Sequence, residues 1–223
     1  MRLLTVSFAA MLPVSMVLLA QTATYPLATL EGLSAHKLKA EPATYQGRKS
    51  IHLTDTAAGN VEDRLVVIQG ATFQDGVIEV DLAGSPGSGA AAAARGFVGV
   101  AFRVAGDLSK FECFYLRPTN GRAEDQERRN HSAQYISFPA WPWMKTRQET
   151  PSKYESYVDL VPGAWTKVKI EVRGDKAKLY VHGVEQPSLI VNDLKMGATA
   201  SGSIALWTGP GTDAYFSNLR VSK

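Results

Sequence analysis

The chain has 223 residues, of which 20% are charged, and its formal net charge is +3 at pH 7. Its basic residues are interleaved with acidic ones, so the sequence does not favour a nucleic-acid partner, although a local basic patch would serve an acidic polysaccharide. Cys113 is the only cysteine. It therefore has no disulfide partner within the chain, and we predict a small buried side chain rather than a reactive thiol.

Residues 1–20 have the pattern of an export signal. Arg2 gives a positive start, residues 3–19 are almost wholly apolar, and Ala20 is a small residue suited to cleavage. The apolar run is short for a membrane span and is interrupted by Pro13. We therefore expect the signal to be removed, with no stable membrane insertion afterwards. The expected product is a secreted or periplasmic protein whose residues 21–223 form one domain.

Short strands dominate the rest of the chain. Apolar and polar residues alternate in 76–82 (GVIEVDL), as they do along a strand with one buried face. The segments predicted to be strands are 64–69, 76–82, 97–104, 111–117, 154–160, 166–173, 177–182, 202–208 and 214–221. Most of them are joined by short turns such as Gly174-Asp175. We therefore predict an all-β, two-sheet antiparallel jelly-roll sandwich.

Residues 118–153 form the one long connection between predicted strands, and long connections in compact domains are usually functional. Part of this connection, 124–143 (EDQERRNHSAQYISFPAWPW), combines charged, amide, imidazole and aromatic side chains without a period of 2 or 3.6. Hydrogen-bonding groups beside flat aromatic faces suit a sugar, which has hydroxyl groups and apolar CH surfaces. The segment therefore predicts carbohydrate recognition.

Three motifs resemble the concanavalin A-like lectin/glucanase superfamily, whose fold is a curved jelly roll. They are GVAFRV with Phe102 and Arg103, KFECFY with Phe111 and Glu112, and the hairpin GAWTKVKIEVRGDKAKLYVHG, which also resembles laminin-G-like domains. The similarity extends to the DUF1080 group, which includes 3-keto-disaccharide hydrolases. This resemblance implies a concave sheet that faces a sugar.

The sequence departs from these families in two places. The aromatic-Glu strand continues with Cys113 and Phe114, where the DUF1080 group usually has Gln and an acidic residue. The Glu-x-Asp-x-x-Glu motif of family-16 glucanases is incomplete, because Glu79 and Asp81 are followed by Gly84 in place of the last acid. The resemblance therefore does not imply retaining glucanase chemistry.

Arg103 and Glu112 are the first candidate site residues. On a concave face, the planar fork of Arg103 could hold a sugar hydroxyl or carboxylate; the alternative is a surface arginine at a strand end. Glu112 lies in an apolar strand, so its carboxylate either faces solvent or lies in a cleft with a raised pKa. In a cleft it could act as a general acid or base.

The polar run supplies further candidates. His131 can transfer a proton near neutral pH, and the amides of Asn130 and Gln134 match vicinal hydroxyls, although these side chains could instead only pin the loop. Trp141 and Trp143 either stack on sugar rings or form an apolar lid on the sandwich. The other residues predicted to contact a ligand are Tyr115, Arg117, Asn120, Arg129, Tyr135 and Tyr157.

Glu155 completes the predicted chemistry. It shares a strand face with Tyr157 and Asp159. This polar face either keeps an edge strand soluble or lines a substrate groove. Glu112 with His131 or Glu155 could supply the acid and the base of a glycoside-cleaving enzyme.

No metal or other cofactor is predicted, because the histidines lack metal-ligand spacing. The one alternative is a structural calcium ion held by oxygens of Asn60, Glu62 and Asp63.

Three functions are compatible with these patterns. The first is an exported jelly roll that binds a glycan or glycoside in a concave groove. The second is a glycoside hydrolase, of the 3-keto-glycoside kind, or a lyase. The third is a non-catalytic adhesion or structural domain. The sequence leaves open whether the protein is an enzyme.

Overall fold

The computed structural model describes residues 21–56 and 63–223. The expected signal peptide, residues 1–20, lies outside this part of the chain. Two of the three candidate calcium ligands, Asn60 and Glu62, also lie outside it. Within the described ranges, no helix has the length and apolar character needed to cross a membrane.

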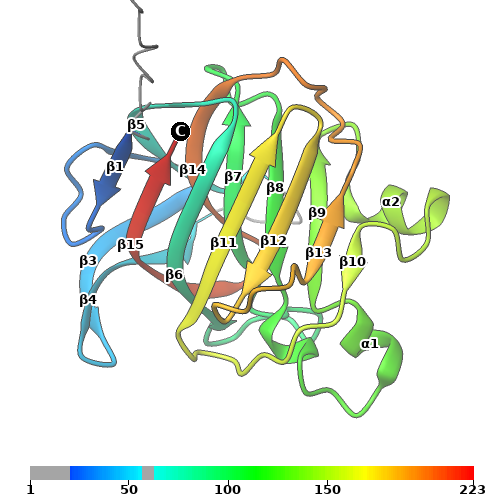
Figure 1. Cartoon of the computed structure of the whole chain (residues 1–223). Coiled ribbons are helices and arrows are strands. Elements are labelled where there is room, and N and C mark those ends of the chain that lie inside the picture. The colour runs from blue at the N-terminus through cyan, green and yellow to red at the C-terminus, as the bar shows by residue number, and fades with distance from the viewer. Residues whose placement is uncertain (1–20, 57–62) are drawn as a thin grey trace, which may run out of the picture.

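Two antiparallel sheets pack face to face (Figure 1). We call the one nearer the viewer the front sheet. Its strands, in spatial order, are β13 (Leu189–Val191), β12 (Lys176–Val181), β11 (Thr166–Arg173), β6 (Gly76–Pro86), β15 (Thr212–Ser222), β4 (Arg48–Asp55) and β3 (Leu38–Tyr45). A short strand, β1 (Thr22–Tyr25), pairs separately with β15.

The other sheet, which we call the back sheet, carries the candidate site. Its strands, in spatial order, are β10 (Glu155–Ser156), β9 (Ala133–Phe138), β8 (Phe111–Leu116), β7 (Val98–Val104), β14 (Gly202–Thr208), β5 (Leu65–Phe73) and β2 (Leu33–His36). The helices are η1 (Pro118–Asn120), α1 (Gln126–Asn130) and α2 (Trp143–Glu149). The prediction of an all-β, two-sheet antiparallel sandwich is confirmed.

Apolar side chains fill both sides of the back sheet. Its inner face packs against the front sheet and contributes residues such as Phe102, Phe114 and Leu116 to the main core. Its outer face carries a second buried cluster around Tyr115 and Trp207, which are only 2% and 3% exposed. The expected open groove therefore does not run across the middle of this face.

The predicted connection 118–153 contains regular structure. It supplies β9, which pairs with β8 and β10 inside the back sheet, and both α1 and α2. The predicted strand 154–160 is reduced to the two residues of β10. The prediction also omitted β1, β2, β3 and β4, which precede the first predicted strand.

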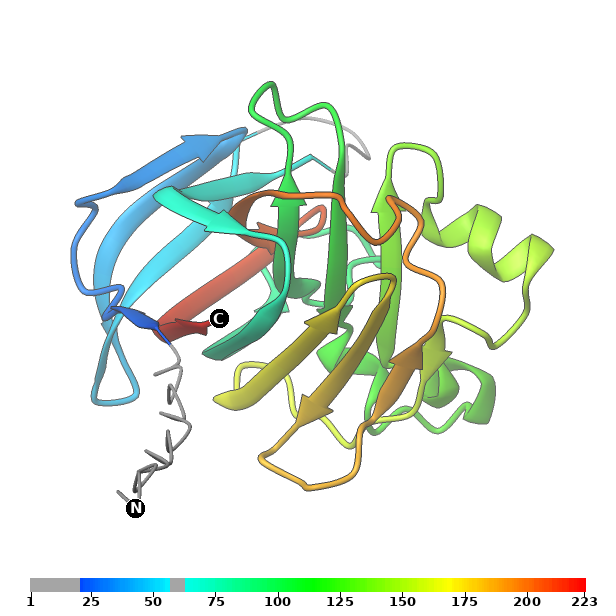
Figure 2. The same cartoon turned by 45° about the horizontal axis from the view of Figure 1, so that its top comes forward.

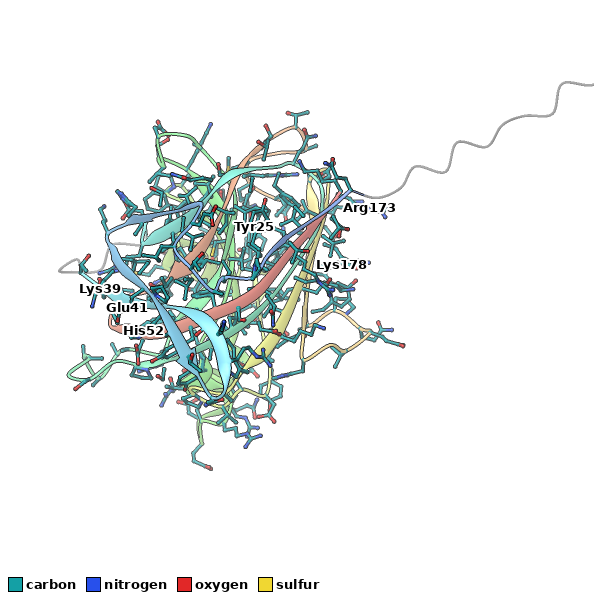
Figure 3. All side chains as sticks on the ribbon, turned by 90° about the vertical axis from the view of Figure 1, so that its left-hand side faces the viewer. Tyr25, Lys39, Glu41, His52, Arg173 and Lys178 are labelled. Atoms are coloured by element: carbon teal, nitrogen blue, oxygen red, sulfur yellow. The ribbon has the colours of Figure 1, made fainter. Side chains whose placement is uncertain are left out.

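Charged side chains lie along the front sheet (Figure 3). Lys39, Glu41 and His52 lie together on the β3–β4 edge, where Glu41 accepts contacts from both of the others. Arg173 and Lys178 lie towards the opposite edge. Acidic and basic groups are mixed on this side, which is typical of a solvated sheet face.

Arg103 is a buried cross-link rather than a surface arginine. Its side chain is 0% exposed, and it donates to the carbonyl oxygens of Gln74, Gly174 and Gly197 at 2.7–3.0 Å. It also contacts Asp75 at 3.2 Å. A guanidinium with five donors can satisfy several loops at once. Arg103 therefore joins three turns at one end of the sandwich.

We predict that Arg103→Met lowers the free energy of unfolding by about 3 kcal/mol or more, because buried carbonyl groups lose their donors. Urea unfolding followed by tryptophan fluorescence measures this loss. Arg173→Met, at an exposed position on β11, is the matched control and should change stability by less than about 0.5 kcal/mol. Equal losses in the two variants would contradict the cross-link.

Candidate functional site

The candidate site begins with one row of side chains across the back sheet. Tyr115 on β8 is opposite Gln134 on β9, and Gln134 is opposite Glu155 on β10. Cross-strand partners point to the same face of a sheet. Tyr115 belongs to the cluster on the outer face, so Gln134 and Glu155 also point outward, at the edge next to α1 and α2 (Figure 2).

The carboxylate of Glu155 is buried between two arginines. Its side chain is 3% exposed, and Arg117 approaches Oε1 to 3.3 Å. Arg147, on α2, donates from Nε to Oε2 at 3.1 Å and contacts Oε1 with its Nη2. A buried carboxylate is costly unless it is paired and hydrogen-bonded. The two guanidinium groups meet this requirement.

Arg117 is held from several sides. Its Nη2 donates to the Tyr115 hydroxyl at 2.7 Å and to Gln134 Oε1 at 3.1 Å, and its Nη1 donates to the His131 carbonyl at 3.0 Å. The Trp143 ring lies near both arginines, with its centre 5.8 Å from the Arg117 guanidinium carbon and 4.9 Å from that of Arg147. Such cation–π contacts add to the ion pairs. The arginines are thus fixed in position.

His131 ends α1 and completes the arrangement. Its Nδ1 lies 2.9 Å from Glu155 Oε2. Burial lowers the pKa of His131 below its ordinary value; the Glu155 carboxylate opposes this shift, and Arg147 and Arg117 reinforce it. The imidazole is therefore neutral at neutral pH. A proton held on Nδ1 beside Glu155 would leave Nε2 as the accepting nitrogen. Nε2 is buried and lies 3.8 Å from Glu127 Oε1.

A pocket of about 200 Å³ opens beside this imidazole, between α1 and β10. We call it the α1–β10 pocket. Its lining combines an amide, an imidazole, a carboxylate, hydroxyl groups and one aromatic ring. The lining residues are Asn130, His131, Ser152, Glu155, Ser156 and Tyr157. Tyr157 is 42% exposed, and its hydroxyl accepts from Arg129 at 3.0 Å.

The structure brings many of the predicted site residues together. Asn130, His131, Glu155 and Tyr157 line the pocket, and Arg129 contacts its rim through Tyr157. The others form the buried support behind it, where Asn120 donates to the His131 carbonyl at 3.2 Å. The remaining supporting residues are Tyr115, Arg117, Gln134 and Trp143.

Four predicted site residues lie elsewhere. Arg103 is the cross-link described above. Glu112 and Tyr135 point inward from β8 and β9, where the Tyr135 hydroxyl contacts Glu112 and accepts from the Lys195 amide at 2.9 Å. Trp141 packs against two lysines instead of the arginines. Ligand contact by these four residues stays a prediction.

Glu112 and Glu155 point to opposite faces of the back sheet. Glu112 is opposite Ser137 on β9, on the inner side, whereas Glu155 is opposite Gln134 on the outer side. Residues three apart on one strand point to opposite faces. The hypothesis that Glu112 and Glu155 flank one scissile bond is therefore not supported by this register. Only the His131–Glu155 combination is brought into contact.

Three residues of the site were missed by the sequence reasoning. Ser152 and Ser156 line the pocket, and Arg147 pairs with Glu155. The spacing of Trp143 and Arg147 could have revealed Arg147, because residues four apart in a helix share a face. The serines carry no comparable signal.

Among residues 21–56 and 63–223, no group of three His, Cys, Asp or Glu side chains is arranged to hold a metal ion.

Comparison with solved structures identifies the fold. The chain is similar to the carbohydrate-binding module CBM66 from Bacillus subtilis, with 15% identity, a TM-score of 0.55 and coverage of 85% of this chain and 95% of that one. A protein of unknown function with a galectin-like fold from Bacillus subtilis matches with 12% identity, a TM-score of 0.53 and coverage of 91% and 97%. Peanut lectin, solved with a 9mer peptide, matches with 9% identity, a TM-score of 0.52 and the same coverage.

The chain has a concanavalin A-like jelly-roll fold. This confirms the predicted superfamily resemblance at the level of the fold. No protein-family model and no curated protein matches the sequence. The narrower resemblance to the DUF1080 group therefore stays a prediction.

Glu112 should make stability depend on pH. Burial raises its pKa above the ordinary value of 4.5, against hydrogen bonds from Tyr135 and the Met196 amide. The folded protein therefore holds this proton more tightly than the unfolded chain does. The protonated Glu112 therefore stabilises the folded protein. This contribution to the free energy of unfolding is complete below about pH 4.5 and is lost as the pH rises through the folded-state pKa.

We predict that Glu112→Gln removes this part of the pH dependence, because glutamine keeps the shape and does not ionise. Urea unfolding at pH 4, 5, 6 and 7 gives the free energy of unfolding at each pH. The slope of this free energy against pH is then compared between Glu112→Gln and the unmodified protein. Glu124→Gln, at an exposed position before α1, is the control and should follow the unmodified protein. Parallel curves for Glu112→Gln and the unmodified protein would contradict the raised pKa.

Proposed function

We propose that the protein binds a carbohydrate through the α1–β10 pocket. The observation that carries this proposal is the pocket lining, which combines hydrogen-bonding groups with the exposed ring of Tyr157. An amide, an imidazole and hydroxyl groups offer both donors and acceptors to sugar hydroxyls. The aromatic ring offers an apolar face to sugar CH groups.

The size of the pocket favours a single sugar ring. Its volume of about 200 Å³ is below the range of about 300–1,000 Å³ that is usual for sites of drug-sized ligands. The occupant would therefore be one residue of a glycan or a simple glycoside. The similarity in fold to a module named as carbohydrate-binding supports this proposal. The export pattern of residues 1–20 supports a periplasmic or extracellular ligand.

Asn130→Ala and Tyr157→Ala should each weaken sugar binding about tenfold, because each removes one polar or aromatic contact from a small site. A panel of mono- and oligosaccharides is screened by thermal shift, and affinities are then measured by calorimetry. Gln148→Ala, exposed on α2 and outside the lining, is the control. Unchanged affinity in both pocket variants would disprove the assignment of the pocket.

A second candidate function is glycoside cleavage in the same pocket, by a hydrolase of the 3-keto-glycoside kind or by a lyase. The observation that favours it is the 2.9 Å contact between His131 Nδ1 and Glu155 Oε2. In this proposal the carboxylate orients the ring, and Nε2 accepts a proton from water or from the substrate. Glu155 is then a positioning residue, and Glu112 takes no part in the step.

The second function predicts a specific pH profile. Because the pKa of His131 is lowered, the imidazole stays neutral at pH values below its ordinary pKa of 6.5. We therefore expect kcat/KM to fall only at a pH more acidic than that value. His131→Gln should lower turnover by about 10²–10⁴-fold while sugar binding is retained. Release of reducing ends or of unsaturated sugars measures turnover. Binding without turnover across the panel supports the first function alone.

A further inference from the structure

Two lysines share the carboxylate of Asp193, and a third lysine lies beside them over the same tryptophan ring. Lys153 Nζ lies 2.8 Å and Lys195 Nζ lies 3.0 Å from Asp193 Oδ2. Lys145, on α2, lies with its Nζ 4.1 Å from the centre of the Trp141 ring, and Lys195 Nζ lies 4.3 Å from the same centre. We call Lys145, Lys153 and Lys195 the lysine cluster. It lies where α2 faces the segment that follows β13 (Figures 1 and 2).

The lysine cluster carries surplus positive charge. Asp193 is the one carboxylate paired with these lysines in residues 21–56 and 63–223, and Lys145 donates instead to the Ala140 carbonyl at 3.2 Å. Burial raises the pKa of Asp193, but hydrogen bonds from Lys153, Tyr154 and Lys195 outweigh it and hold the pKa at about 2. Asp193 is thus ionised at neutral pH. Three ammonium groups against one carboxylate leave two positive charges unbalanced.

The backbone that presents Lys195 is fixed from inside the sandwich. Its amide donates to the Tyr135 hydroxyl at 2.9 Å, and the next amide, of Met196, donates to Glu112 Oε1 at 2.7 Å. The side chain of Lys195 is only 16% exposed and lies over the rings of Trp141 and Tyr154. A cation that is already held in place loses less conformational freedom when an anion binds.

The lysine cluster and the α1–β10 pocket adjoin along the chain. Ser152 lines the pocket, and Lys153 belongs to the cluster. Trp141 and Tyr154 add aromatic surface beside the ammonium groups. Ammonium groups suit oxyanions because they act as compact charges with three rotatable donors. The neighbourhood thus combines features that fit a sugar ring with features that fit a negatively charged substituent.

We propose that the lysine cluster binds the oxyanion, a carboxylate or a sulfate group, of an acidic saccharide. The saccharide part of this inference rests on the proposed function, whereas the anion part rests on the lysine cluster alone. A ligand whose ring occupies the pocket and whose charged group reaches the lysine cluster would engage both sites. The protein would then prefer acidic glycans to neutral ones of the same size.

The test compares trigalacturonate with its methyl ester, which has the same rings without the charge. Calorimetry at low salt should show tighter binding of the acid form to the unmodified protein, and added NaCl should reduce that preference because salt screens exposed charges. Lys145→Met and Lys195→Met should each weaken binding of the acid form about fivefold and leave binding of the ester unchanged. Lys178→Met, exposed on β12 (Figure 3), is the control.

Asp193→Asn separates anion binding from a purely structural ion pair. Removing this carboxylate releases Lys153 and Lys195, so the acid form should bind about fivefold more tightly. A cluster that only stabilises the fold would show a lower melting temperature and no gain in affinity. Glucose 6-sulfate and inorganic sulfate, measured in parallel, separate a sugar-borne anion from a free one.

Each outcome decides one part of the proposal. Equal affinity of the unmodified protein for trigalacturonate and its ester would overturn the inference. Equal affinity for inorganic sulfate and glucose 6-sulfate would overturn its saccharide part. Lysine-dependent binding of the acid form that is insensitive to Asn130→Ala supports the lysine cluster and rejects the pocket. In the opposite case, Asn130→Ala weakens binding of the ester and the acid form binds no more tightly than the ester. That result supports the pocket and rejects the lysine cluster.

Discussion

Side chains on a β-strand alternate between two faces, and on β8 and β9 this alternation separates two polar systems. Glu112, Tyr135 and Ser137 point into the sandwich, and Tyr115 and Gln134 point outward towards Glu155. A shift of one residue in the pairing of β8 with β9 would exchange the two systems. The inner system then could not reach the amides of the segment after β13, and the outer one could not reach the arginines. The register of this strand pair therefore fixes both polar systems.

The outer system depends on a complete set of partners. A carboxylate that leaves water loses a large hydration energy, and only close cations with well-placed donors recover it. Glu155 receives Arg117 from the strand side and Arg147 from the helix side. Because α2 carries both Arg147 and Trp143, the packing of that short helix and the neutralisation of the carboxylate depend on each other. This coupling explains why a helix of only seven residues is held at the sheet edge.

Local sequence predicts the strands with clear alternation and misses those without it. The limits of β11 and β14 match the predicted segments, and the Gly174-Asp175 turn lies between β11 and β12 as expected. In contrast, β9 (AQYISF) has buried polar residues on both faces, so it does not show the apolar alternation of a half-buried strand. Pro42 in β3 discourages a strand assignment, yet β3 is an edge strand, where proline is tolerated.

The site could be predicted only as a set of residue types. The density of amide, imidazole and aromatic groups in 124–143 indicated a ligand near His131, and the pocket lies there. The choice of Glu155 over Glu112 as the partner of His131 depends on the β8–β9–β10 register, which no local pattern records. Arg147 and Ser152 come from a helix and a turn that the sequence analysis treated as one loop, whereas Ser156 lies in β10, within the predicted strand 154–160. Tertiary pairing supplied what local pattern could not.

The outer strands of both sheets are poor templates for another molecule. The back sheet ends at β10, with two residues, and at β2, with four; the front sheet ends at β13, with three residues, and at β3, which contains Pro42. A neighbouring copy that docked on any of these described edges would find few unpaired amide and carbonyl groups in a row. Copies at high local concentration could thus lie side by side without polymerising through their sheets.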